Sequence, residues 1–248
     1  MSVAAILVTG ASRGIGAAIA LALAEAGYLV GCVSRTGTLP SRDGASAPSQ
    51  ASLMSLRADV TDAAALRQAF DEFAERAGMA VVGLVNNAGI HEEAKSHSMP
   101  RSQWDEVMTA NALSTVFGCQ AAYPHLLANG GGLIVNIGSF FDKLGVKRNL
   151  AYCASKAAVG AITRVLAVEW AKAGIRVVDV APGYIVTDLN RQSLGEGPLS
   201  EFLEARIPRG RPGTAEEVGT FVASLFAHGG SFLNGETIYL DGGQGNAL

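Results

Sequence analysis

The sequence predicts an α/β fold in which helices cover both faces of a parallel β-sheet. Short apolar runs rich in branched residues alternate with longer stretches of helical periodicity along the chain. Such alternation is typical of β–α–β units, in which helical crossovers join parallel strands. The strand-like runs are continuously apolar, which indicates a sheet buried on both faces. No linker or composition break divides the 248 residues, so a single domain, residues 1–248, is expected.

Periodicity and turn residues place the individual elements. Strands are expected at residues 3–8, 28–33, 53–58, 81–85, 133–137, 176–180 and 237–240. Helices are expected at residues 17–26, 61–76, 102–126, 152–173 and 215–227. Residues 36–52, rich in Ser, Thr, Gly and Pro, predict a loop. Residues 184–208, interrupted by Gly195, Gly197 and Pro198, predict either a lid over a site or an ordinary surface excursion.

Composition excludes several classes of protein. Hydrophobic residues make up 49% and charged residues 17%, which is typical of a globular domain. The formal net charge of −3 argues against nucleic acid as a partner, and no run of eighteen apolar residues indicates a membrane span. Cys32, Cys119 and Cys153 fit neither a disulfide framework nor a metal site, so reduced thiols in a cytoplasmic protein without metal are expected.

A glycine-rich segment, Thr9 to Gly16, lies between the first strand and the first helix. Its glycines allow a tight turn and the close approach of a pyrophosphate, and the helix N-terminus offers free N–H groups and a positive dipole end. The segment therefore predicts a dinucleotide site, with a merely structural turn as the alternative. The residues expected to border the cofactor here are Gly10, Ser12, Arg13, Gly14, Ile15 and Gly16.

Six further motifs follow this segment along the chain. They are Asn86-Asn87-Ala88-Gly89, Asn111, Ser139, Tyr152-Cys153-Ala154-Ser155-Lys156, Pro182-Gly183 and Asp241-Gly242-Gly243. Together with the Gly-x-x-x-Gly-x-Gly spacing, they resemble the short-chain dehydrogenase/reductase family over about residues 3–243. The resemblance implies a single Rossmann-type doubly wound parallel sheet flanked by helices, and an oxidoreductase that uses a nicotinamide cofactor.

The end of the second strand bears on which nicotinamide cofactor is used. An acidic residue there usually holds a free ribose 2′-hydroxyl, but this chain has Ser34 followed by Arg35. Arg35 and Arg13 could instead grip a 2′-phosphate through charge-assisted hydrogen bonds. Family members with this arginine pattern use NADP(H), which we therefore favour over NAD(H). The alternative for Arg35 is a solvated surface charge.

The resemblance implies further cofactor contacts, each with a plainer alternative. Asp59 and Val60 resemble the adenine contact, although Asp59 could simply cap a helix. Thr187 resembles the contact to the nicotinamide carboxamide, although it could be an ordinary lid threonine. The segment Asn86–Gly89 is expected to border the cofactor or only to end its strand. The remaining expected contacts are Asn87, Ala88, Gly89, Tyr152, Lys156, Pro182, Gly183 and Ile185.

A tyrosine and a lysine carry the expected chemistry. Tyr152 and Lys156 are four residues apart on a predicted helix, so they share one face. A free tyrosine has a pKa of about 10, and a nearby positive charge favours its phenolate and lowers that value. By resemblance, Lys156 also binds the nicotinamide ribose and Tyr152 is the acid/base. Ser139 positions the substrate oxygen, and Asn111 is the water-relay residue, although Tyr-x-x-x-Lys spacing also occurs by chance and Ser139 could be a turn serine.

The expected substrate is a small molecule. An apolar pocket, part of which could be core, is expected from Phe140, Phe141, Leu144, Tyr184 and Leu189. Residues 127–132 contain no Lys or Arg, which weakens docking of an acidic carrier protein and favours a free ketone or secondary alcohol. His91 is expected to line this pocket or the surface, and Cys153 to serve packing rather than reactivity.

Three other functions stay open, and the assembly is expected by resemblance alone. The first is a 3-oxoacyl-carrier-protein reductase, and the second is a non-catalytic NADP-binding redox sensor. The third is an isomerase or epimerase of the related extended fold, although such relatives have a larger C-terminal substrate region. A homotetramer is implied by the resemblance, with the helices at residues 102–126 and 152–173 packed between subunits.

Overall fold

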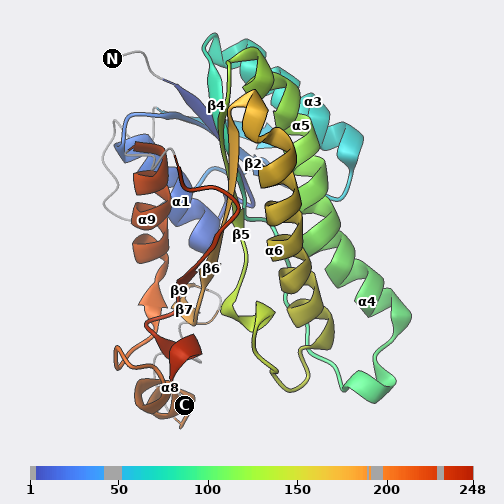
Figure 1. Cartoon of the computed structure of the whole chain (residues 1–248), viewed down its shortest axis with the longest axis vertical. Coiled ribbons are helices and arrows are strands. Elements are labelled where there is room, and N and C mark those ends of the chain that lie inside the picture. The colour runs from blue at the N-terminus through green and yellow to red at the C-terminus, as the bar shows by residue number, and fades with distance from the viewer. Residues whose placement is uncertain (1–3, 42–51, 189, 191–197, 228–231, 248) are drawn as a thin grey trace.

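The structure, a computed structural model, describes residues 4–41, 52–188, 190, 198–227 and 232–247 (Figure 1). Its centre is a seven-stranded sheet of order β3-β2-β1-β4-β5-β6-β9, in which every neighbouring pair is parallel. The strands are β1 (Ala5–Thr9), β2 (Leu29–Ser34), β3 (Leu53–Arg57), β4 (Val81–Asn86), β5 (Gly132–Ile137), β6 (Ile175–Pro182) and β9 (Thr237–Leu240). This is the doubly wound order, so the predicted Rossmann-type sheet is confirmed.

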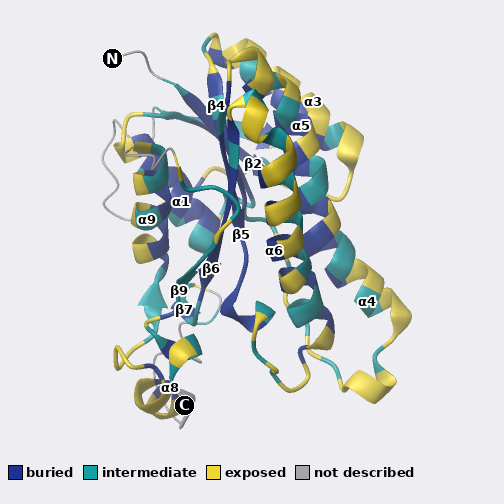
Figure 2. Ribbon diagram, in the orientation of Figure 1, coloured by how far each residue is buried: buried dark blue, intermediate teal, exposed yellow. Residues whose placement is uncertain are grey.

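Helices cover the two faces of the sheet, as Figure 1 shows with the sheet nearly edge-on. One face carries α1 (Gly14–Glu25) and α9 (Ala215–Ala227), which pack on each other. The other face carries α3 (Ala63–Ala77), α5 (Ser114–Ala128) and α6 (Leu150–Trp170). Each face has its own apolar core, and the central strands between them are mostly buried (Figure 2), whereas the edge strands β3 and β9 are mostly partly buried. Burial on both faces explains why the strands are continuously apolar in sequence.

The predicted helix at residues 102–126 is in fact two α-helices joined by a π-helical turn. It comprises α4 (Arg101–Met108), a π-turn at Thr109–Leu113 and then α5. The hydroxyls of Ser114 and Thr115 each donate to the carbonyl four residues earlier, at 2.7 Å and 2.8 Å. The wider turn places Asn111, a side chain that hydrogen-bonds outside its own helix, and single π-turns of this kind are frequent at functional sites.

The region predicted as a lid contains regular structure that the sequence did not indicate. The short strand β7 (Ile185–Val186) pairs with β8 (Gly213–Thr214), and α8 (Pro198–Arg206) follows β7 along the chain. Leu203 and Ile207 are buried there against Tyr184 and Val186. The lid prediction also rested on Gly195 and Gly197, which lie outside the described residues. Leu189, predicted to line the substrate pocket, also lies outside them, as does most of the predicted loop at residues 36–52.

Helix α6 has the chemistry of a core helix. By length and mean hydropathy alone, residues 150–173 would qualify as a membrane span, which is weak evidence because core helices pass the same criterion. Its buried residues Ser155, Lys156 and Thr163 are polar or charged, and the helix packs on β6. The Thr163 hydroxyl accepts a hydrogen bond from the Asn136 side chain at 2.9 Å, which fixes α6 against β5. The helix that carries Tyr152 is therefore anchored to the centre of the sheet.

Candidate active site

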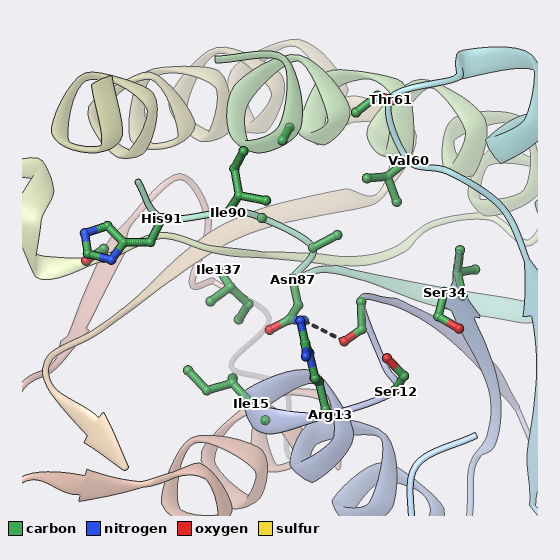
Figure 3. Close-up of a pocket in the computed structure, with 18 of the residues that line it drawn as sticks. Ser12, Arg13, Ile15, Ser34, Val60, Thr61, Asn87, Ile90, His91 and Ile137 are labelled. Carbon is green, nitrogen blue, oxygen red and sulfur yellow. Dashed lines mark hydrogen bonds between the residues drawn. The ribbon is translucent and has the colours of Figure 1, made fainter. Parts of the chain in front are cut away.

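A cavity of about 820 Å³ runs along the carboxyl ends of the strands. It crosses the gap between β1 and β4, where the strand order reverses and where doubly wound sheets bind their ligands. Figure 3 shows Ser12 and Ser34 toward one end of this cavity and His91 at the other. The predicted residues that line it are Gly10, Ser12, Arg13, Gly14, Ile15, Gly16, Ser34, Arg35, Asp59, Val60, Asn87, Ala88, Gly89, Ser139, Tyr152, Lys156, Pro182, Gly183 and Thr187.

The glycine loop leaves no room for side chains. Gly10 and Gly14 have φ values of 65° and 58°, a conformation that side-chain-bearing residues rarely adopt. A Cβ on Gly16 would lie 2.3 Å from the carbonyl oxygen of Gly10 and 2.4 Å from the Asn87 side chain. Helix α1 begins at Gly14, so its free N–H groups face the cavity that the loop borders. The loop therefore has the geometry of a phosphate cradle.

The segment after β4 locks this loop in place. The Thr9 hydroxyl accepts hydrogen bonds from the backbone N–H groups of Asn87 and Ala88, at 3.0 Å and 3.1 Å. The Asn87 amide donates to the carbonyls of Thr9 and Gly10. Asn86, which was also expected to border the cofactor, instead points into the core and donates to the Asn136 side chain. Its predicted position was wrong because alternate residues of a strand face opposite sides.

Two arginines border the end of the cavity nearest β2. Arg13 and Arg35 are exposed and line it, whereas Ser34, the last residue of β2, is buried. The backbone carbonyl of Arg35 accepts a hydrogen bond from Arg57 Nε at 3.1 Å. No acidic side chain occupies the position that Ser34 takes at the end of β2, so this end of the cavity is suited to an anionic group.

Asp59 does not cap helix α3, so the capping alternative was wrong. Asp62 caps α3 by accepting from Ala64 and Ala65, whereas Asp59 accepts from the backbone and hydroxyl of Thr61, at 2.9 Å and 2.7 Å. The hydrogen bonds from Thr61, and then the charge of Arg35, lower the pKa of Asp59. Asp59 is therefore an ionised residue on the cavity wall, held away from the helix.

Tyr152, Lys156 and Ser139 meet at the other end of the cavity. Lys156 is buried, and its Nζ donates to the carbonyl of Ile137 at 2.8 Å and lies 5.8 Å from the centre of the Tyr152 ring. Burial lowers the pKa of Lys156 to about 8, and the charge of Asp179 opposes this shift. Burial raises the pKa of Tyr152, while a hydrogen bond with Ser139 lowers it.

The direction of the Tyr152 pKa differs from the sequence expectation. A neighbouring lysine predicted a lowered value, but the loss of solvent around the buried phenol is the largest effect and raises the pKa of Tyr152. Tyr152 therefore keeps its proton well above neutral pH, which is the form a proton donor needs.

Asn111 lies behind Lys156 rather than in the cavity. Its amide donates to the Ile90 carbonyl at 2.9 Å and to the Ser155 hydroxyl at 3.0 Å, and its oxygen accepts from the Ile90 backbone at 2.8 Å. A Cβ on Gly89 would lie 2.9 Å from the Asn111 oxygen and 3.8 Å from Lys156 Nζ. Asn111 therefore connects the segment after β4 to helix α6, and the backbone of Gly89 lies between Asn111 and Lys156 Nζ.

The residues expected to form the substrate pocket divide into two groups. Phe140 and Phe141 are buried and form core beneath the site, as their sequence pattern allowed. His91 lines the cavity, with its ring centre 4.7 Å from that of Tyr152 and its Nε2 hydrogen-bonded to Asn149. The ring of Tyr184 packs on Phe140 at 5.3 Å. Tyr184 lines a separate, smaller hollow, so the aromatic rings at the catalytic end of the cavity are those of His91 and Tyr152.

Thr187 and Ile185 have different surroundings, although both follow β6. The Thr187 methyl group would lie 3.6 Å from a Cβ on Gly14, so Thr187 faces the glycine loop across the cavity. Ile185 is buried in the core under β7 and lines a separate, smaller hollow. The structure thus brings Thr187, but not Ile185, to the candidate site.

Some residues of the site were not predicted. The acidic residues Asp105 and Glu106 of α4 line the cavity beside Thr109, and no motif marks them in the sequence. Asp179 is fully buried beneath the catalytic end. The available signal was an acidic residue within the strand IRVVDVAP, which is apolar apart from Asp179 and Arg176. A charged residue in a strand buried on both faces is unusual and could have indicated a functional position.

Comparison with known proteins agrees with this geometry. The family model described as Enoyl-(Acyl carrier protein) reductase matches residues 10–244. The chain is 33% identical over 243 residues to D-threitol dehydrogenase of Mycolicibacterium smegmatis, covering 96% of this chain and 91% of that protein. It is 36% identical over 242 residues to a 3-oxoacyl-acyl-carrier-protein reductase of Staphylococcus aureus, covering 96% of both.

Solved structures agree as well. A gluconate 5-dehydrogenase from Burkholderia cenocepacia, in complex with NADP and tartrate, superposes with a TM-score of 0.88 at 32% identity, covering 100% of this chain and 97% of that one. The family match spans most of the chain, and the relatives align over nearly their whole length. The chain therefore belongs to the short-chain dehydrogenase/reductase family of oxidoreductases.

Proposed function

We propose that this protein is an NADP(H)-dependent oxidoreductase that interconverts a ketone and a secondary alcohol. The observation that carries the proposal is the layout of one cavity. A glycine loop and two arginines border one end, and Ser139, Tyr152 and Lys156 meet at the other. A dinucleotide laid from the first end to the second would bring its nicotinamide to the tyrosine.

The residues present fit NADP(H). The cradle at Gly10–Gly16 has no room for a side chain at Gly10 or Gly16 and suits a pyrophosphate. Arg13 and Arg35 would hold the 2′-phosphate, for which guanidinium groups offer paired donors. Asp59 and Val60 would border the adenine, Thr187 the carboxamide, and Lys156 the ribose next to the nicotinamide. The similar gluconate 5-dehydrogenase is a complex with NADP, which supports the same choice here.

The proposed chemistry divides between cofactor and protein. When bound, the nicotinamide supplies or accepts the hydride. Tyr152 gives its phenolic proton to the carbonyl oxygen in reduction and takes it back in oxidation. The Ser139 hydroxyl donates to the same oxygen and fixes its position. The Lys156 ammonium stabilises the phenolate that Tyr152 becomes, and Asn111 holds the backbone beside the lysine.

A free ketone carrying an apolar group is the substrate class that the site favours. His91 and the ring of Tyr152 give the catalytic end an aromatic surface. Residues 127–132, the loop before β5, carry no basic side chain for an acidic carrier protein. The relatives' names cover a polyol, a sugar acid and a carrier-bound acyl chain, so a 3-oxoacyl-carrier-protein reductase is the second candidate function.

A redox sensor and an isomerase are less favoured by the site. A redox sensor that only binds NADP needs no proton donor, yet Tyr152 and Ser139 are hydrogen-bonded at the cavity. An isomerase would form product without net consumption of NADPH, which a turnover assay detects. We extend the proposal to a single domain over residues 1–248 and to a cytoplasmic homotetramer, and the exposed apolar side chains of α6 support the assembly.

The first experiment measures the binding of NADPH and NADH by fluorescence titration. We compare the wild-type protein with Arg35→Ala and with the control Arg67→Ala, which removes an exposed arginine of α3 that does not line the cavity. The proposal expects NADPH to bind more tightly than NADH in the wild type and in the control. It expects that preference to collapse in Arg35→Ala, because a charge-assisted bond to the phosphate is lost.

Two other outcomes would change the assignment. Equal binding of both cofactors, unchanged by Arg35→Ala, would sink the role of the arginine and point to alcohol oxidation with NAD. With the cofactor known, NADPH oxidation is followed with free ketones and with a 3-oxoacyl group on its carrier protein. Faster turnover of the carrier-bound substrate would replace the first candidate function by the second.

A further inference from the structure

Asp179 is a buried carboxylate that the proposed chemistry does not use. It lies in the middle of β6 and is 0% exposed. Its Oδ2 accepts a hydrogen bond from the Thr237 hydroxyl at 3.1 Å. Its Oδ1 has no hydrogen bond of good geometry among the described residues, because the nearby backbone N–H of Gly138, which favours the ionised carboxylate, donates to the Val180 carbonyl. A buried carboxylate with an unsatisfied oxygen destabilises a fold unless something compensates it, so its presence calls for a functional reason.

Two glycines make the space that this carboxylate fills. A Cβ on Gly138 would lie 2.5 Å from Oδ1 and 2.8 Å from Oδ2, so any side chain at position 138 would collide with Asp179. A Cβ on Gly160 of α6 would lie 3.8 Å from Oδ2. Gly138 itself lines the large cavity next to Ser139. The carboxylate therefore lies directly beneath the floor of the catalytic end.

Lys156 reaches the same short piece of backbone from the helix. Its Nζ donates to the carbonyl of Ile137, the residue before Gly138. Lys156 and Gly160 are one turn apart on α6, so both face β6 and the end of β5. The two buried charges thus flank the Ile137–Gly138 peptide, and each stabilises the charged form of the other.

Titratable and polar groups from three elements face Asp179. From the 3-10 turn at Phe140–Asp142, Asp142 opposes its ionisation, but this carboxylate accepts from the Tyr239 hydroxyl at 2.9 Å. From β9, Thr237 donates to it. From α6, Arg164 approaches Gly160, and its charge acts on Tyr239. Among these described neighbours, the cation whose charge acts on Asp179 is Lys156.

We propose that Asp179 is a positioning residue that keeps Lys156 protonated at the catalytic end of the cavity. The effect of Asp179 on turnover rests on the proposed function, whereas its electrostatic effect on Lys156 does not. Burial alone would drive the lysine toward its neutral form. A neutral lysine would not stabilise the tyrosine phenolate. The buried Asp179 carboxylate opposes this loss of the lysine's proton from beneath the cavity floor, outside the space proposed for substrate and cofactor.

The direct test titrates Lys156 by NMR. The chain has five lysines, Lys95, Lys143, Lys147, Lys156 and Lys172, so ¹³C-labelled lysine gives few signals, and Lys156→Arg assigns the one of interest. We compare wild type, Asp179→Asn and the matched control Asp142→Asn, which also removes one negative charge from the cluster. The Lys156 midpoint is expected to fall by roughly one pH unit in Asp179→Asn and to stay in place in the control.

A second variant protects the test against misfolding. Asp179→Asn leaves a buried side-chain amide at the site where Oδ1 has no hydrogen-bond partner. Asp179→Ala is therefore measured as a second variant. Far-UV circular dichroism checks that both variants fold. A lowered Lys156 midpoint in the folded variants supports the proposal. An unchanged midpoint in either folded variant overturns it, whatever happens to activity.

Turnover separates this proposal from the proposed function. If ketone reduction with NADPH is observed, the alkaline limb of its pH profile is expected to move to lower pH in Asp179→Asn, together with the lysine midpoint. A purely structural role would lower the rate without moving that limb and would overturn the proposal. If the wild type reduces no ketone but the lysine midpoint still falls, the proposed function fails and the link between Asp179 and Lys156 stands.

Discussion

At the scale of single residues, the phenol of Tyr152 makes the sharpest prediction. Tyr152→Phe removes the proton donor and leaves the ring packed beside His91 and Phe141. We expect kcat for ketone reduction to fall by about 10²- to 10⁴-fold, the usual contribution of a positioned acid, while NADPH still binds. Stopped assays of product and fluorescence titration measure the two quantities.

A conservative control separates chemistry from packing. Tyr28→Phe makes the same change on a ring that packs on Phe226, on the other face of the sheet, and should leave kcat unchanged. Equal rates for Tyr152→Phe and wild type would remove Tyr152 from the proton transfer. A parallel loss of NADPH binding would assign the residue to cofactor binding instead.

Asp179 makes a second residue-scale prediction, on stability. Burial raises its pKa to about 6, above the unfolded value of 3.8, so between these values the folded state binds more protons than the unfolded state. Stability contributed by this group is therefore present at low pH and lost as pH rises through that window. From about pH 4 to about pH 7, the unfolding free energy of Asp179→Asn should gain about 1 to 3 kcal/mol relative to wild type.

Urea unfolding at fixed protein concentration measures this difference. The concentration must be fixed because assembly contributes to apparent stability. The comparison pairs the two proteins at each pH, so groups whose pKa the substitution leaves unchanged cancel. A difference between variant and wild type that does not change with pH would mean that Asp179 does not titrate in this window. A variant that is less stable at both pH values would indicate that the carboxylate is structural.

The sequence predicted the residues of the site better than their electrostatics. Ser139, Tyr152 and Lys156 could be predicted from the sequence because their spacing and order are distinctive. All three line the cavity. The pKa direction of Tyr152 was wrong, because burial depends on elements far away in the chain. Asp179 was missed, since its role is visible only when β6 is laid against β5 and α6.

At the scale of elements, the turn from β1 into α1 should tolerate no side chain. Gly16→Ala would place a methyl group about where the Gly10 carbonyl and the Asn87 amide already lie, at 2.3 Å and 2.4 Å. The loop must shift, so we expect NADPH affinity to fall by at least about tenfold, a loss of about 1.4 kcal/mol. Fluorescence titration of folded protein measures it.

Gly145→Ala is the matched control for the glycine loop. Nothing lies within 4 Å of a Cβ at Gly145, and its backbone is not in the left-handed region. This variant should bind NADPH as the wild type does. Undiminished binding by Gly16→Ala would show that the loop adapts, and would weaken its assignment as the pyrophosphate cradle.

The elements that the sequence predicted are those with strong periodicity. All seven strands appear at the expected places, within a few residues, because continuous apolar runs bounded by turn residues are unambiguous. The π-turn at Thr109–Leu113 was not predicted, since it arises from the contacts of Asn111 with Ile90 and Ser155. Helix α8 was missed because glycines precede it in the sequence, Pro198 is its first residue and its periodic stretch is short.

At the scale of the whole molecule, the strand order assembles the site. Residues from the ends of β1, β2, β4, β5 and β6 meet at one edge, although they lie far apart in the chain. The segment after β1 contributes the cradle with Arg13, and the segment after β2 contributes Arg35. The segments after β4 and β6 contribute walls, and the segment after β5 contributes the catalytic serine. Helix α6 adds Tyr152 and Lys156 by packing on β6. The sheet lies between two apolar cores, so it also separates α1, which follows the glycine loop, from α6, which carries the catalytic residues.

The outer face of α6 makes the last prediction, on assembly. Val165 and Val168 lie three residues apart on α6 and are 55% and 80% exposed, and Leu150 at the start of the same helix is also exposed. Such a stripe on a helix that is otherwise packed favours association between copies of the chain. We expect wild type to elute as a tetramer, and Val165→Glu combined with Val168→Glu to give smaller species, because buried like charges would face each other.

Size-exclusion chromatography with light scattering measures the mass. Thr220→Glu, an exposed substitution on α9 across the sheet, is the control and should keep the wild-type mass. Since both valines are already exposed in the single chain, the double variant should retain its fold and its NADPH binding. A monomeric wild type would contradict the homotetramer. A tetramer that survives both charges would place the interface elsewhere, and would leave the exposed stripe of α6 facing solvent.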